Sequence, residues 1–179
     1  MSETQGQYLA RISGYVEGKN HFKVLRRTVK KLFLLIKKAP RRMLFISPGP
    51  SMWSVGEILA HLAESELVFG YRLRRVLAAN GATVEAFDQN LWQANAGYLK
   101  KDIMMSLQLF SVLRENNLSL LKSLTKEQWD AFGLHEERGK ENISRMVELY
   151  AGHDVNHLKQ IETIVSAKGK GERRKRKNA

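Results

Sequence analysis

Two histidines, His153 and His157, stand four residues apart in the segment AGHDVNHLKQIE near the C-terminal end of the chain. The surrounding pattern is that of an amphipathic helix, in which residues four apart lie on one face with Cβ atoms about 5–6 Å apart. Two imidazoles at that separation can bind one metal ion. Because Met146 and Ile164 share this face, we expect the pair to point toward the core, where an unpaired ring nitrogen is costly.

A third histidine, His61, occupies a second amphipathic segment, WSVGEILAHLAESELV. It falls on the same stripe as Ile58, Val68 and Arg72, so it too is expected to face inward. Two histidines from one helix and one from another would supply three of the four ligands of a zinc-like site and leave the fourth position open. The alternative is three core histidines that are hydrogen-bonded to carboxylates or water.

A divalent ion held by three neutral imidazoles keeps its full charge, and it can lower the pKa of a bound water toward about 7. The open position would then serve hydrolysis, or it would hold a thiolate for transfer. Zinc and nickel both suit imidazole ligands. The expected partner is a small-molecule substrate, and a thiol is one class that suits the open position.

Five further residues are candidates for orienting or covering this site. Two lie one turn from His61, one lies one turn from His157, and two lie in connecting segments that could close over the ion. In that order they are Glu57 and Glu64, Gln160, and Asp88 and His135. Their alternative roles are ordinary edge residues on the helices and turn residues in the loops.

The composition favours a single domain over 1–167 that binds metal through histidine and carboxylate. The chain has 179 residues and no cysteine, which excludes disulfides and thiolate ligands. Its N-terminal residues lack the layout of a secretory signal, and no apolar run is long enough to span a membrane. We therefore expect a cytoplasmic protein without a membrane partner.

The hydrophobic periodicity predicts an all-α fold, an up-and-down four-helix bundle. The expected helices cover about 20–38, 54–79, 102–123 and 142–167, and no segment alternates well enough to indicate a strand. Capping boxes mark two helix starts, Ser54 with Glu57 and Thr125 with Gln128. The long connections, 81–101 and 125–141, are rich in aromatic residues and are expected to be packed.

The formal net charge of +12 is concentrated in two places. One is the first predicted helix with its flanks, 19–42, and the other is the run KGKGERRKRK at 168–177, whereas the segment between them is mildly acidic. The run can bury nothing apolar, so 168–179 is expected to be a disordered basic tail. Nucleic acid, if bound at all, would be bound through such a tail without sequence preference.

The chain resembles the DinB-like superfamily of metal-binding four-helix bundles, which includes YfiT-like proteins. The resemblance covers about 20–166 and is carried, in order, by WSVGEILAHLAESELV, RLRRVLAANG, FDQNLW, GLHEERG and AGHDVNHLKQIE. It implies a homodimeric bundle with a divalent metal held by His61, His153 and His157. It also implies a metal-dependent hydrolase or a thiol S-transferase of the bacillithiol type, in some members linked to stress.

Two functions of different classes follow. The first is an enzyme whose three-histidine site has an open coordination position. The second is a non-catalytic, stress-related binding protein whose basic first helix and tail engage nucleic acid or an acidic partner. Chelation of the metal would abolish the first function, whereas deletion of the tail would abolish the second.

Overall fold

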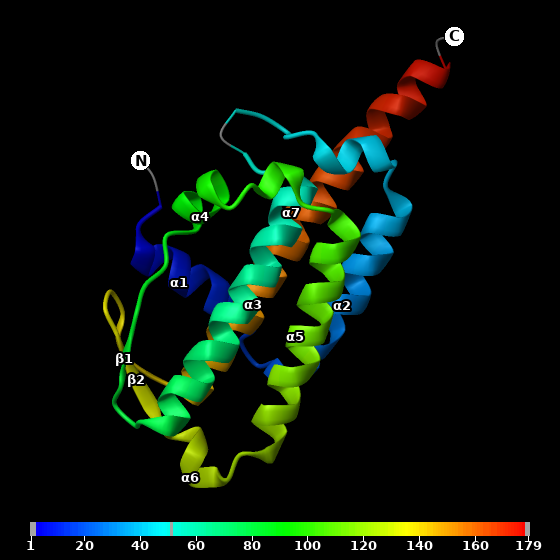
Figure 1. The fold of residues 1–179 in the computed structure, drawn as a ribbon. Helices are drawn as coiled ribbons and strands as arrows, with labels where there is room; N and C mark the ends of the chain where they lie inside the picture. The colour runs from blue at the N-terminus through cyan, green and yellow to red at the C-terminus, as the bar shows by residue number, and fades with distance from the viewer. Residues whose placement is uncertain (1–2, 51, 178–179) are drawn as a thin grey trace.

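Four long helices form a bundle in the computed structural model, which describes residues 3–50 and 52–177, with side chains throughout except at Leu99 and 167–177 (Figure 1). They are α2 (His21–Lys38), α3 (Val55–Ala78), α5 (Ile103–Ser123) and α7 (Ile143–Lys177). Each corresponds to one of the helices expected from hydrophobic periodicity. The prediction of an all-α, four-helix bundle is therefore confirmed.

The order of directions in the bundle is up, down, down, up. In Figure 1, α2 and α7 run toward the top of the molecule, whereas α3 and α5 both run toward the bottom. Helix α3 packs on α5 and α7, and α2 packs on the same two helices from the other side. The parallel course of α3 and α5 departs from the simple alternation expected, because the long connection after α3 returns the chain to the top before α5 begins.

Helix α3 begins at the capping box that the sequence indicates. The side-chain oxygen of Ser54 accepts a hydrogen bond from the backbone N–H of Glu57, and the Glu57 carboxylate accepts one from the backbone N–H of Ser54. These bonds satisfy two backbone donors that have no partner within the helix. The same reciprocal pair forms between Thr125 and Gln128 at α6 (Lys126–Trp129).

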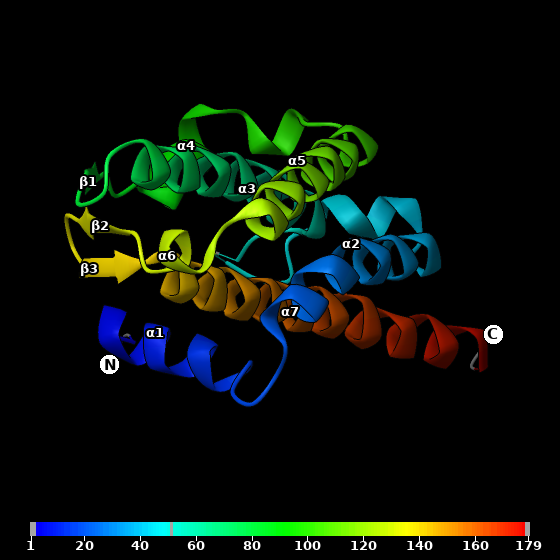
Figure 2. The same cartoon turned by 90° about the horizontal axis from the view of Figure 1, so that it is seen from below.

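A small three-stranded sheet joins the two long connections, and the expectation that the chain has no strands is wrong. Strand β1 (Thr83–Val84) pairs in parallel with β2 (Phe132–His135), which pairs antiparallel with β3 (Gly139–Asn142). Strands of two to four residues are too short to show alternation, and the parallel pair joins segments far apart in sequence. The sheet lies beside the lower end of α3 in Figure 1 and at one end of the bundle in Figure 2.

Several shorter elements were not expected as helices. Helix α1 (Gln5–Gly14) packs on α7, and α4 (Gln89–Asn95) lies against α3. The 3-10 turns η1 (Arg41–Phe45) and η2 (Tyr98–Lys100) also pack on α3. Apart from α1, these elements lie in the connections between the long helices, so the prediction of packed connections is confirmed. Their effect is to close the upper end of the bundle around α3.

The backbone of 168–177 continues helix α7 as far as Lys177, which differs from the disordered tail expected for 168–179, and residues 178–179 lie outside the described part of the chain. None of the helices in the described part of the chain has the length and apolarity required to cross a bilayer.

Candidate metal centre

His61 lies two turns into α3, on the C-terminal side of the Ser54 capping box, and its side chain is buried. The capping box fixes where α3 begins and therefore which face His61 occupies. His153 and His157 lie on successive turns of α7, which packs against α3. Because the two helices are in contact, the histidine of one faces the pair of the other, as the sequence predicts.

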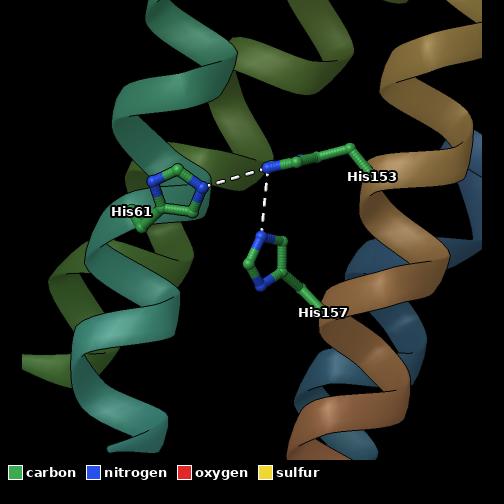
Figure 3. A group of neighbouring side chains, drawn as sticks. All are labelled: His61, His153 and His157. Carbon is green, nitrogen blue, oxygen red and sulfur yellow. Dashed lines mark hydrogen bonds between the residues drawn. The ribbon is translucent and has the colours of Figure 1, made fainter. Parts of the chain in front are cut away.

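The Nε2 atoms of the three imidazoles converge on one point. Nε2 of His153 lies 3.0 Å from Nε2 of His61 and 3.0 Å from Nε2 of His157 (Figure 3). One ligand atom from each of the three residues lies within 4.8 Å of the other two. Tetrahedral nitrogen ligands at about 2.0–2.1 Å from zinc would lie roughly 3.3 Å apart. The observed arrangement is close to that required for three ligands of one ion.

The environment keeps all three imidazoles neutral at pH 7. Burial lowers the pKa of His61 and of His157 well below the ordinary value, and the neighbouring histidines lower both further. Burial also lowers the pKa of His153 to about 4, with a smaller contribution from the positive charge of Arg114. Metal binding requires the neutral ring with a lone pair on the ligating nitrogen, so no proton has to be removed from these ligands at neutral pH.

The positions of the ring hydrogens in the cluster are compatible with a cation at its centre. Nδ1 of His157 lies 2.8 Å from Oε1 of Gln160, a contact in which Nδ1 donates and Nε2 keeps its lone pair. Nε2 of His153 can donate at most one hydrogen, although it has two neighbouring Nε2 atoms at 3.0 Å. The Ser65 hydroxyl, 3.3 Å from Nε2 of His61, can donate to that atom, but hydrogen bonds among the rings cannot satisfy every close pair, whereas a divalent ion would accept all three lone pairs at once.

Of the residues expected to orient the histidines, Gln160 contacts one of them directly, through Oε1 at 2.8 Å from Nδ1 of His157. Glu57 and Glu64 have other partners. The Glu57 carboxylate accepts hydrogen bonds from Ser54 and from the side chain of Gln93. The Glu64 carboxylate accepts from the hydroxyl of Tyr98 and from Lys101.

Among the described residues, Nδ1 of His61 and Nδ1 of His153 have no hydrogen-bond partner.

The structure places Asp88 and His135 beside the triad, as lining residues of one cavity. Asp88 is exposed and caps α4, where its carboxylate accepts from the backbone N–H groups of Asn90 and Leu91. His135 lies at the end of β2 and is buried. The parallel pairing of β1 with β2 carries His135 to this position, which the sequence reasoning treated only as a loop.

This cavity, which we call the triad cavity, has a volume of about 340 Å³ and is lined by His61 and His153 together with residues of α1, the 86–90 segment and the β2–β3 hairpin. A second hollow of about 860 Å³ adjoins it, sharing Tyr8, Gln89 and Asn90, and is lined by His157 and Gln160. The volume of the triad cavity suits a small organic molecule. The ring centroid of Phe87 lies 6.4 Å from that of His61, with the two rings stacked, and the ring centroid of Trp53 lies 5.0 Å from that of His61. These aromatic rings shield the triad from water.

A buried ion network lies beside the triad and was missed in the sequence. The guanidinium of Arg114 on α5 pairs with Asp154 on α7 at 2.6 Å and with Glu66 on α3 at 2.8 Å, and it donates to the backbone oxygen of Leu25 on α2. One side chain therefore joins all four long helices. The signal was present in the sequence, because Arg114 interrupts the apolar stripe of α5 four residues after Phe110.

The family comparison matches residues 24–161, most of the chain, to the model of the DinB superfamily. The chain belongs to the DinB superfamily. The resemblance proposed from the order of its sequence blocks is thereby confirmed. The histidine triad lies within the matched region.

Relatives of this DinB chain include a protein of Oceanobacillus iheyensis that is 29% identical over 114 residues, which cover 64% of this chain and 65% of the relative. Another, from Halalkalibacterium halodurans, is 28% identical over 110 residues, 62% of this chain and 64% of the relative. The names of both assign them provisionally to the metal-dependent hydrolases. In each case the match spans slightly less than two thirds of the relative.

Among solved structures, YfiT from Bacillus subtilis has the same fold, with a TM-score of 0.78 over 94% of this chain and 91% of YfiT. Its sequence is 20% identical, so the likeness concerns the fold. YfiT is described provisionally as a metal-dependent hydrolase with an unusual four-helix bundle topology. The parallel course of α3 and α5 described above is one way in which this DinB chain departs from simple alternation.

Proposed function

We propose that this protein is a metal-dependent hydrolase of small molecules, in which His61, His153 and His157 hold one zinc or nickel ion. The observation that carries the proposal is the convergence of three neutral Nε2 atoms, two of which, those of His61 and His153, belong to residues that line the triad cavity. The provisional names of the relatives and of YfiT agree with it. When bound, the ion supplies Lewis acidity toward a substrate oxygen.

The chain's own residues provide the environment for that chemistry. The triad holds the ion from two helices whose separation is fixed by the Arg114 network. Phe87 and Trp53 exclude water from one side of His61. The hydroxyl of Ser65 lies 3.3 Å from Nε2 of His61 and can share a hydrogen bond with a molecule in the cavity.

The first experiment measures divalent-metal content in protein purified without an affinity tag. We expect about one equivalent of metal in the native chain and little in His153→Ala, while His21→Ala, which changes a histidine outside the cluster, retains the metal. Zinc- and nickel-loaded protein is then tested on ester and amide substrates before and after chelation. No metal in the native chain, even after addition of zinc and nickel, would overturn the proposal.

Transfer of a thiol would use the same ion site as hydrolysis. The substrate assay distinguishes thiol transfer from hydrolysis. Because the chain has no cysteine, a thiol must come from a substrate. Turnover that requires an added low-molecular-weight thiol would assign the site to a thiol S-transferase. Turnover in water alone supports the hydrolase.

Deletion of 168–179 tests the binding function that the basic residues suggest. If the site carries the function, the deletion leaves metal content and turnover intact. Nucleic-acid binding that is lost on deletion and falls steeply with salt would instead support the binding protein. The homodimer implied by the family resemblance is a separate prediction, which sedimentation equilibrium of the full chain tests.

A further inference from the structure

His135 presents a defined hydrogen-bond donor to the triad cavity. Its Nδ1 accepts a hydrogen bond from the backbone N–H of Glu137 at 3.2 Å. A neutral imidazole that accepts at Nδ1 carries its proton on Nε2. That Nε2–H is buried, lines the cavity through a side chain only 2% exposed, and has no partner among the described residues.

Arg72 supplies a buried positive charge to the same cavity. The residue is 5% exposed and lines the cavity from α3. Its guanidinium donates to the backbone oxygen of Glu85 and lies over the ring of Phe87 at 5.8 Å. In the described part of the chain, no carboxylate forms an ion pair with Arg72, and a buried charge without a counter-ion is costly.

Among the described residues, none of the other charged groups of the cavity forms an ion pair with Arg72. Arg138 is paired through two contacts with Glu141, at 2.7 and 2.8 Å. Asp88 and Glu137 are exposed, and their carboxylates already accept hydrogen bonds. Burial, together with the positive charges of Arg138 and Arg72, lowers the pKa of His135 to about 4, so this imidazole is neutral at pH 7. The wall therefore offers one buried guanidinium that has no directly paired carboxylate, and one N–H that has no partner among the described residues.

We infer that Arg72 and His135 form a subsite for the carboxylate of the substrate, which is accordingly a small carboxylic acid carrying the hydrolysable bond. A carboxylate matches the single charge of Arg72, and its two oxygens can accept from the guanidinium and from Nε2–H of His135. A phosphate carries more negative charge than this wall compensates. Phe87 contacts both His61 and Arg72, so it sets the subsite beside the triad.

This inference names the substrate class of the proposed hydrolase, but its test does not require turnover. The probes are succinamate, which carries one carboxylate, and succinamide, its neutral counterpart. Binding to the full chain is measured by calorimetry, first with zinc and then after chelation, with native helicity verified by circular dichroism. The metal-free measurement is decisive, because zinc itself would bind a carboxylate.

We expect metal-free protein to bind succinamate at least about tenfold more tightly than succinamide, and Arg72→Gln to remove that preference. Arg72→Lys, which keeps the charge, should retain part of it. Arg74→Gln is the matched control, because Arg74 is on the same helix but bonds to Asn116 and Asn117 outside the cavity. Succinamate should also shift the ¹⁵N signal of the protonated Nε2 of His135, which a purely structural histidine would not show.

Equal affinity for the two probes, or a preference that survives Arg72→Gln in a folded variant, would overturn the inference. Tighter binding of inorganic phosphate than of succinamate would overturn the assignment to carboxylate. Either result would leave the metal-dependent hydrolase standing. Conversely, a protein without hydrolytic activity could still show the preference for succinamate.

Discussion

Oε1 of Gln160 lies 2.8 Å from Nδ1 of His157, one turn away on α7. This contact fixes the side of the imidazole that carries the proton, and it leaves Nε2 directed at the other two histidines. Gln160 therefore sets which nitrogen of His157 is free to bind the proposed metal ion.

We expect Gln160→Leu to weaken zinc binding by about 10–100-fold, the usual effect of removing a partner of a ligating histidine. The fold should be retained, because Gln160 is an exposed residue. Competition with a fluorescent chelator measures the affinity. The control is Glu162→Ala on the same helix, which should bind zinc normally; equal affinity of Gln160→Leu and native protein would show that the contact does not orient His157.

Removal of Arg114 should destabilise the protein far more than removal of a surface arginine. Arg114→Met leaves two buried carboxylates, Glu66 and Asp154, without their cation, and we expect a loss of about 3–5 kcal/mol in the free energy of unfolding. Arg145→Met, whose partner Glu148 is only partly buried, should cost less than about 1 kcal/mol. Urea unfolding of both variants measures the difference, and equal losses would contradict the structural role given to Arg114.

Ser54→Ala should lower the free energy of unfolding by about 1–2 kcal/mol. The Ser54 hydroxyl accepts from the backbone N–H of Glu57 and also donates to its carboxylate, in a buried setting. Thr125→Ala changes the same type of cap on the four-residue α6, where the contacts are exposed, and should cost less. Thermal and urea midpoints compare the two, and an unchanged midpoint for Ser54→Ala would argue against its part in starting α3.

Metal-free protein should become less stable as the pH falls from 6.5 toward 4. Burial lowers the folded-state pKa of His135 and of His153 to about 4, against 6.5 in the unfolded chain, and lowers those of His61 and His157 as well. Between these values the unfolded state binds more protons, so stability is intact above pH 6.5 and is lost progressively below it.

Urea unfolding at pH 7.5, 6.5 and 5.5 tests this dependence. His135→Gln should reduce the slope of stability against pH, because it removes one of the four groups without touching the triad. A free energy of unfolding that does not change between pH 7.5 and 5.5 would mean that these histidines bind protons in the folded state as they do in the unfolded chain, so that burial does not lower their pKa values.

The bundle and the ligand pair were predictable because they depend on short-range patterns. The periodicity of apolar residues defined the four long helices, and a spacing of four placed His153 and His157 on one face. The capping box at Ser54 marked the start of α3 and, with it, the inward face of His61. These relations are set by the geometry of a single helix, so they can be recognised from the amino-acid sequence of this chain alone.

Only the tertiary structure decided which side chains meet the triad. Spacing placed Glu64 one turn from His61, yet its carboxylate turned to Tyr98 and Lys101, because side-chain direction depends on the neighbours brought by other segments. Likewise, His135 faces the cavity because β2 pairs with β1, about fifty residues earlier in the chain. The sequence by itself determined the four long helices and the three histidines that converge, while contacts between distant segments decided the cavity, its free donor and the position of the Arg72 guanidinium.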